Sequence, residues 1–272
     1  MKKRIILFIC LNLLLSFFCV LWTENLIDVK QLTPIRQEII LSSEYREQKI
    51  NEELLPYLEK DAGTKVALYL LESNYGYETW NYDFDKALKK RKQQEGYDAF
   101  AETTKSIWND VKCFPIPEFT NKKNLTVSYN NTWMAERTYG GKRNHEGIDL
   151  IASKNQRGLY PVLSMTDGTV TKKGWLEKGG YRIGITTEKG AYFYYAHLES
   201  YSSVEIGDKV KAGDILGFMG DSGYGEEGTV GQFAVHLHLG IYIYVDEKEI
   251  SVNPYWVLRY IEKNKVKCYT EI

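Results

Sequence analysis

The histidines of this chain are few and closely grouped. There are four in all, between positions 145 and 238. His145 and Asp149 are four residues apart in HEGID, and His236 and His238 are two apart in VHLHL. In an extended strand, side chains two or four residues apart share one face, so each pair can converge on one point. Imidazole and carboxylate are zinc ligands, and a catalytic zinc takes three protein ligands and keeps a fourth position for water.

Each motif has a plainer explanation when it is taken alone. A His-x-x-x-Asp pair is usually a surface pair, and His-x-His on a strand is more often structural than ligating. Here both occur in a chain that has just one further histidine, His197, at the end of the strand-like segment YYAHL. The combination favours a metal site over either plain explanation.

Four segments, in this order, resemble the lysostaphin-type zinc endopeptidases, the LytM-like family of peptidoglycan hydrolases: HEGIDL, YYAHL, VKAGDILGFMGDSGYG and HLHLGI. The resemblance covers residues 115–260 and leaves the N-terminal 110 residues unmatched. It implies a peptidoglycan peptide as substrate and one Zn²⁺ per chain, held by His145, Asp149 and His238.

The same resemblance implies that His197 and His236 are the catalytic pair. Zinc lowers the pKa of its bound water and polarises the scissile carbonyl, and a neighbouring imidazole accepts the proton of the water. We expect His236 to be the base and His197 to orient water or stabilise the oxyanion, with the reverse assignment open. Tyr139, before Gly140-Gly141, resembles a family tyrosine that donates a hydrogen bond to the oxyanion; simple packing at a Gly-rich turn is the alternative.

The chain departs from the family pattern in two places. Residues 226–234 make a longer approach to His-Leu-His than is usual, and Gly240 stands where the family often has Glu. The five metal and catalytic positions are intact. These departures concern substrate specificity and the surroundings of the site.

Composition sets the scale of the molecule. The chain has 272 residues with 43% hydrophobic content, enough for one medium domain with a core and a smaller second element. With 35 basic and 36 acidic residues, the net charge gives no indication of electrostatic binding to nucleic acid. The partners must therefore be inferred from the site.

The N-terminus predicts export or anchoring. Residues 1–4 would be a cytoplasmic tail, and the apolar run over residues 5–22 a transmembrane anchor or signal, because eighteen helical residues span roughly 27 Å. Positive residues precede the run and no small-x-small cleavage site follows it, which favours an uncleaved single-pass anchor in the cell membrane. The catalytic domain would then lie outside the cytoplasm, and the protein would be secreted if the leader is cleaved.

The remaining chain reads as an α+β protein with two parts. Residues 23–111 form a helical stalk or module, with a helical pattern over 34–60 and helices over 84–94 and 97–110, broken at Gly96. Residues 112–264 form a mainly antiparallel β domain of LytM-like type, with the zinc site in a groove of the sheet, and 265–272 a tail. The expected core of the small module consists of aromatic residues: Trp80, Tyr82, Phe84, Phe100 and Trp108.

Short Val-, Ile-, Thr- and Tyr-rich segments separated by glycines indicate the strands. We expect strands over 159–165, 169–172, 181–187, 191–198 and 232–245, with Asp167-Gly168 as a hairpin turn. Cys113 and Cys268 flank this domain and form either a disulfide or two free thiols.

Three other functions compete with the peptidase. A wall-binding or regulatory scaffold of the same fold, silent or controlled by a partner, is the first. A carrier module is suggested by the GDKVKAGDILG turn, but a Met-Lys-Met attachment site is missing. A metal-storing or sensing protein would leave two histidines unexplained. For the helical module, a spacer, a lid and a docking site for a protein partner all remain open.

Overall fold

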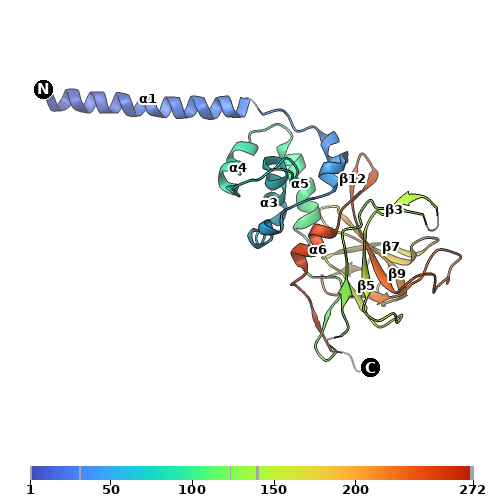
Figure 1. Ribbon diagram of the computed structural model, residues 1–272. Helices are drawn as coiled ribbons and strands as arrows, with labels where there is room; N and C mark the ends of the chain where they lie inside the picture. Colours follow the sequence, from blue (N-terminus) through green and yellow to red (C-terminus); the bar gives the residue numbers. More distant parts are fainter. Residues whose placement is uncertain (1, 31, 123, 139–140, 270–272) are drawn as a thin grey trace.

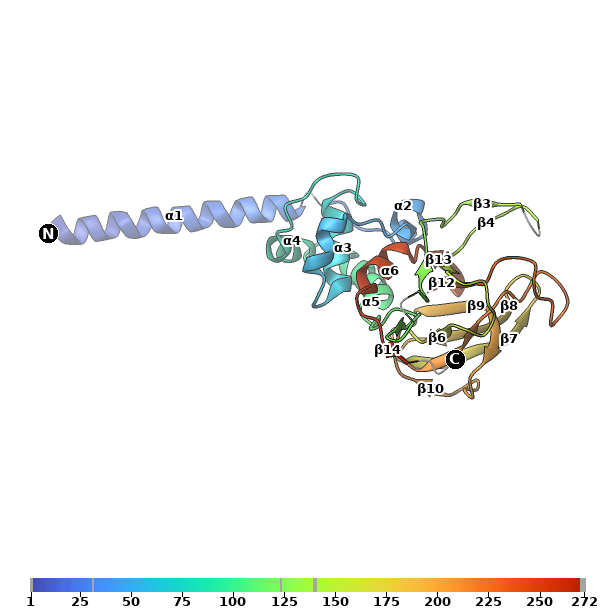
Figure 2. The ribbon, with the colours of Figure 1, turned by 60° about the horizontal axis from the view of Figure 1, so that its bottom comes forward.

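The computed structural model describes residues 2–30, 32–122, 124–138 and 141–269 (Figure 1). Helices fill the N-terminal part and strands the C-terminal part, and the long helix α1 (Lys2–Lys30) extends away from both in the two views (Figures 1 and 2). Across these described ranges, no helix combines the length and apolar character that a membrane span needs. The anchor expected over residues 5–22 is not confirmed.

The helical module is confirmed, with shorter helices than expected. The helices predicted over 84–94 and 97–110 are present but end earlier, and Gly96 precedes the second with a φ of 84°, which favours glycine. The pattern over 34–60 forms three short segments rather than a long helix, and Pro56 lies inside the last of them. The elements are η1 (Gln37–Leu41), α2 (Ser43–Arg46), η2 (Glu52–Tyr57), α3 (Ala62–Glu72), α4 (Phe84–Arg91) and α5 (Tyr97–Trp108).

Aromatic residues form the centre of this module, as the sequence predicted. Phe100 and Trp108 are fully buried on α5, and the Trp108 indole N–H donates to Gln48 Oε1 at 2.8 Å. Trp80 packs edge-on against Phe84 with ring centroids 5.0 Å apart. These contacts hold the aromatic rings and the indole N–H of Trp108 inside the module.

The C-terminal part is built on one large antiparallel sheet. The central order is β10-β7-β8-β9-β12-β5-β2, and β6, β11 and β13 are joined to it. The elements are β1 (Glu118–Phe119), β2 (Val127–Ser128), β3 (Glu136–Arg137), β4 (Arg143–Asn144), β5 (Ile148–Ala152), β6 (Pro161–Leu163), β7 (Gly168–Leu176), β8 (Gly180–Thr186), β9 (Tyr192–Tyr201), β10 (Lys209–Val210), β11 (Ile215–Met219), β12 (His236–Val245), β13 (Lys248–Val252), α6 (Tyr255–Ile261) and β14 (Lys267–Cys268).

The prediction of a hairpin turn at Asp167-Gly168 is wrong. β6 pairs with β11 rather than with β7, and Gly168 is the first residue of β7. A side chain at Gly168 would meet the backbone of Thr186 at 2.6 Å, so the glycine permits close strand packing. Asp167 instead accepts hydrogen bonds from Lys112 Nζ at 2.7 Å and from the Ala212 N–H at 2.9 Å.

A segment near the C-terminus, β14, pairs with the β domain. In the stretch expected to be a tail, β14 pairs in parallel with β1, which places Cys268 opposite Phe119. Cys113 and Cys268 are both free thiols, which decides between the two alternatives. The Cys113 thiol donates to the carbonyl oxygen of Ser164 at 3.1 Å.

The central sheet divides the domain into two faces. Buried residues such as Ile183, Ile185 and Tyr195 point to one face and form the core. Their neighbours in the strands point to the other face, because side chains alternate along a strand. That second face carries Asp149 and His238, which are opposite one another in the register of β5 and β12.

Candidate active site

Two adjacent strands bring the predicted ligands together. His238 on β12 pairs with Asp149 on β5 on one side and with Ala196 on β9 on the other. His145 precedes β5 and is held through its backbone N–H, which donates to the Ala135 carbonyl at 2.9 Å. The convergence expected from spacing is therefore present, although His145 reaches the site from a connection and not from the same strand as Asp149.

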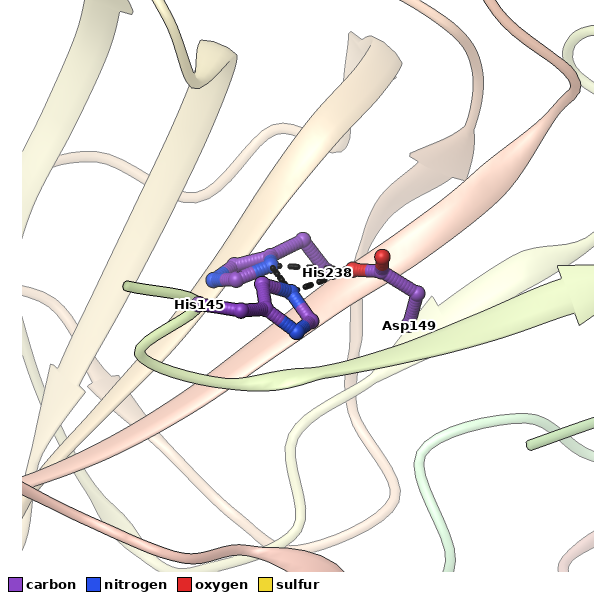
Figure 3. Close-up of side chains that lie close together, drawn as sticks. All are labelled: His145, Asp149 and His238. Carbon is purple, nitrogen blue, oxygen red and sulfur yellow. Dashed lines mark hydrogen bonds and ion pairs between the residues drawn. The ribbon is translucent and has the colours of Figure 1, made fainter. Parts of the chain in front are cut away.

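The three side chains point toward one another and form a triangle of ligand atoms (Figure 3). His145 Nε2 lies 3.0 Å from Asp149 Oδ1 and 3.1 Å from His238 Nδ1, and His238 Nδ1 lies 3.0 Å from the same carboxylate oxygen. Ligand atoms of a tetrahedral zinc site lie about 3.3 Å apart, because each is about 2.0 Å from the ion. The observed spacing fits a small cation.

Hydrogen bonds behind the triangle decide which nitrogen atoms face it. His145 Nδ1 lies 3.1 Å from the carbonyl oxygen of Thr132, which can only accept, so Nδ1 carries the proton and Nε2 presents a lone pair. The His238 Nδ1 can donate to at most one of its two neighbours. His145 Nε2 and Asp149 Oδ1 then face each other as two acceptors, with no proton between them. A cation bound there would stabilise both lone pairs.

The charge states suit metal ligation as well. Burial alone would raise the pKa of Asp149, but its contacts with His145 and His238 hold that pKa well below the usual range, so it is a carboxylate. Burial lowers the pKa of His238, so its imidazole is neutral. Arg137 Nη2 lies 3.2 Å from His145 Nδ1 but directs its shorter contact, 2.7 Å, to Asp149 Oδ2.

The other two histidines lie beside the triangle. The ring centroids of His197 and His236 are 4.7 Å apart, and His236 Nε2 lies 3.7 Å from Asp149 Oδ1. His197 Nδ1 donates to the Ser222 carbonyl and His236 Nδ1 to the Ala234 carbonyl, each at 2.8 Å. In both rings the Nε2 atom is thus left as the acceptor when the ring is neutral. Burial lowers the pKa of His197 well below its usual value, which keeps it neutral.

His197 reaches the groove because β9 is irregular. Its backbone has a φ of 61°, uncommon for a residue with a side chain, and the pairings of β9 with β8 and with β11 both shift register nearby. A bulge re-aims a side chain that strict alternation would send to the other face. Ala196 and His197 are neighbours in sequence, and the groove face carries both the Ala196 position and the His197 ring.

The site opens into a groove of about 720 Å³. Tyr139, the proposed oxyanion donor, lies outside the described residues. Several other residues line the groove. The sequence did not indicate them, because none belongs to a recognisable ligand motif: Arg137, Arg143, Arg182, Tyr192, Tyr194, Tyr224, Phe233 and Tyr242. Arg182 could have been found from the sequence, because it alternates with the apolar Ile183 and Ile185 along a strand and so faces away from the core.

The two departures from the family pattern have structural counterparts. The longer approach to His-Leu-His carries Phe233, whose ring packs against His197 and His236 with centroids 4.7 and 4.9 Å away. Gly240 leaves room for the ring of Tyr242, which a Cβ at that position would approach to 2.6 Å. Both features shape the groove beside the metal site.

Known proteins match both parts of the chain. The model for peptidase family M23 matches residues 143–254, and that for the LytM N-terminal domain matches residues 33–110. A crystal structure of a LytM protein from Ruminococcus gnavus ATCC 29149 is 52% identical, covers 86% of this chain and 96% of that chain, and has a TM-score of 0.81. This chain belongs to peptidase family M23. The resemblance read from the sequence is confirmed, and the N-terminal part it left unmatched has a family of its own.

Curated relatives match part of the chain. The L-Ala–D-Glu endopeptidase of Bacillus subtilis (strain 168) is 42% identical over 151 residues, which are 55% of this chain and 44% of the relative. The glycyl-glycine endopeptidase ALE-1 of Staphylococcus capitis is 35% identical over 97 residues, 35% of this chain and 24% of the relative. The alignments span less than half the length of these curated relatives.

Proposed function

We propose that this M23 chain is a zinc-dependent endopeptidase that hydrolyses peptide bonds in bacterial peptidoglycan, outside the cytoplasm. The observation that carries the proposal is the triangle of His145, Asp149 and His238, with ligand atoms 3.0–3.1 Å apart and without enough protons to satisfy them. The relatives named above support peptidoglycan peptides as the substrate, and their names include two different bonds.

The residues beside the triangle supply the remaining chemistry. Zinc, when bound there, would polarise the scissile carbonyl and lower the pKa of a water molecule. His236 Nε2, 3.7 Å from Asp149 Oδ1, is placed to accept the proton of that water, and the Ala234 carbonyl fixes the ring through Nδ1. His197, buried and neutral, is placed to orient the water or to share the proton transfer.

Hydrolysis of purified peptidoglycan by the full chain tests the proposal. We expect zinc to bind in a one-to-one ratio, and a chelator to abolish the release of peptide fragments, with recovery when zinc is returned. Asp149→Asn should lose both zinc and activity. His236→Ala should keep zinc and lose at least about a hundredfold in rate, since a general base contributes about 10²–10⁴.

The matched control is Asp246→Asn, the same carboxylate-to-amide change at an exposed turn between β12 and β13. It should leave zinc content and hydrolysis unchanged. A chain that binds zinc and releases no fragment from peptidoglycan would contradict the enzymatic proposal and favour the scaffold.

A further inference from the structure

Arg182 lies in the same row of the groove face as the proposed ligands. It is placed between Tyr181 and Ile183 on β8, at the point where the register with β9 shifts. On β9 the two residues between the partners of Tyr181 and Ile183 are Ala196 and His197, and Ala196 pairs with His238 on β12. Two strand spacings of about 4.8 Å therefore separate the backbones of Arg182 and His238.

The guanidinium of Arg182 has two unsatisfied donors in the described part of the chain. Its Nε and Nη1 atoms are shielded from solvent and have no hydrogen-bond partner among the residues that the structure describes. Two other cations that line the groove have carboxylate partners: Lys172 Nζ lies 2.9 Å from Glu249 Oε2, and Arg137 Nη2 lies 2.7 Å from Asp149 Oδ2. Because shielded donors without acceptors are costly, a carboxylate that enters the groove would be stabilised at Arg182.

Two phenols, Tyr192 and Tyr194, line the same groove as Arg182. Tyr192 is 2% exposed, and its hydroxyl is buried without a hydrogen-bond partner in the described part of the chain. Gly184, two residues from Arg182 on β8, makes room for that hydroxyl, since a Cβ there would lie 2.2 Å from Tyr192 Oη. Tyr194, two residues further along β9, lines the groove with Arg182, and its ring lies edge-on to His238 with centroids 5.9 Å apart. Each phenol carries an O–H group that can donate a hydrogen bond to a carboxylate.

We propose that Arg182, with the hydroxyls of Tyr192 and Tyr194, forms a carboxylate-binding subsite beside the scissile bond. This rests on the proposed function and narrows its substrate class to peptides with a free carboxylate on a residue next to the cleaved bond. The planar fork of a guanidinium matches the two oxygens of a carboxylate. A bridge made of glycine residues has no side-chain carboxylate to offer these donors.

Binding of two non-hydrolysable peptides by the full, zinc-loaded chain tests the subsite. The peptides are identical except that the residue beside the scissile position carries a carboxylate in one and a carboxamide in the other. We expect the acid to bind roughly tenfold to a hundredfold more tightly, the range for hydrogen bonds to charged groups. Arg182→Gln should remove this preference. Tyr192→Phe, which deletes one hydroxyl, should reduce it several-fold.

Lys178→Gln is the matched control, because Lys178 is an exposed cation that lines the same groove. It should change the preference by less than about twofold. Circular dichroism establishes that each variant is folded. Equal affinity for the two peptides, or a preference that survives in Arg182→Gln, would overturn the subsite. A preference that disappears when zinc is removed from the wild-type chain would also overturn the subsite, because it would mean that the carboxylate binds zinc rather than Arg182.

Cleavable versions of the two peptides separate this inference from the proposed function. If the chain binds the acid preferentially and cuts neither peptide, the enzymatic proposal fails and the subsite stands. If it cuts both with the same kcat/KM, the endopeptidase stands and the subsite fails. We expect cleavage of both, with the acid favoured in the wild type and the two rates equal in Arg182→Gln.

Discussion

At the scale of single residues, the space around His238 limits what the HEGID segment can contain. A Cβ at Gly147 would lie 2.6 Å from His238 Nε2 and 2.5 Å from the Leu239 carbonyl oxygen. The second of these atoms is backbone in β12 and cannot move without disturbing the sheet. The glycine is therefore needed for the position of the His238 ring.

Gly147→Ala should weaken zinc binding by about tenfold to a hundredfold, the usual cost when the support of a metal ligand is disturbed. Competition with a chromophoric chelator measures the affinity. Glu146→Ala, at the exposed neighbouring position, should bind zinc as the wild type does. Unchanged affinity in Gly147→Ala would mean that His238 is not held where the structure has it.

The Cys113 thiol should be unreactive in the folded chain. Burial raises its pKa to about 11, and the thiolate is the reactive form, so little of it exists at pH 8. The raised pKa also means that stability falls as pH rises from about 8.5, the ordinary thiol value, to about 11. Iodoacetamide at pH 8, followed by peptide mass analysis, should modify the partly exposed Cys268 and spare Cys113 until denaturant is added. Equal labelling of both thiols in the native chain would contradict the buried placement.

At the scale of elements, α3 and α5 approach each other closely through Gly63. A Cβ at Gly63 would lie 2.4 Å from Lys105 Cα on α5. The Gly63 N–H also donates to Asn109 Oδ1 at 2.6 Å, just beyond the end of α5. The two helices therefore make contact through backbone atoms, which cannot yield as a flexible side chain would.

Gly63→Ala should destabilise the chain by about 1–3 kcal/mol, the usual range for overpacking, despite the better helix propensity of alanine. Urea denaturation followed by circular dichroism gives the free energy of unfolding. Glu102→Ala, on the exposed face of α5, should be within about 0.5 kcal/mol of the wild type. A stabilised Gly63→Ala variant would show that the helices can separate freely.

At the scale of the whole molecule, the helical module and the β domain are joined by specific bonds and a shared core. Arg46 Nε and Nη2 donate to the Ser251 carbonyl and hydroxyl, each at 2.9 Å, and the Arg46 carbonyl accepts from the Asn253 N–H at 2.8 Å. Buried apolar residues of both parts form one cluster, and Trp108 lies 5.9 Å from Tyr260 between ring centroids. The two parts should therefore unfold together.

Arg46→Ala should lower the free energy of unfolding by about 2–3 kcal/mol, because hydrogen bonds to a charged group are worth about 1.5–3 kcal/mol. Arg46→Lys keeps the positive charge but lacks the two parallel N–H donors of the guanidinium. It should therefore recover less than half of the free energy of unfolding that Arg46→Ala loses. Differential scanning calorimetry measures both variants. A wild-type chain that already unfolds in two separate transitions would contradict the joint unfolding of module and domain.

Much of the site follows from local features of the sequence. Residue type indicates the proposed metal ligands, and the two-residue period of a strand is enough to place His236 and His238 on one face. The helices over α4 and α5 follow from apolar spacing and from Gly96, all of which act within a few residues. Such signals are local, so they can be read along the chain without knowledge of the partners.

Tertiary structure decided what depends on distant partners. Asp167-Gly168 has the chemistry of a turn, yet strand pairing across the sheet makes Gly168 part of β7. His197 faces the groove because β8 and β11 shift the register of β9. Arg182 becomes a candidate subsite only where β8, β9 and β12 lie side by side. Pairing between strands is set by long-range packing, whose energy no short stretch of sequence contains.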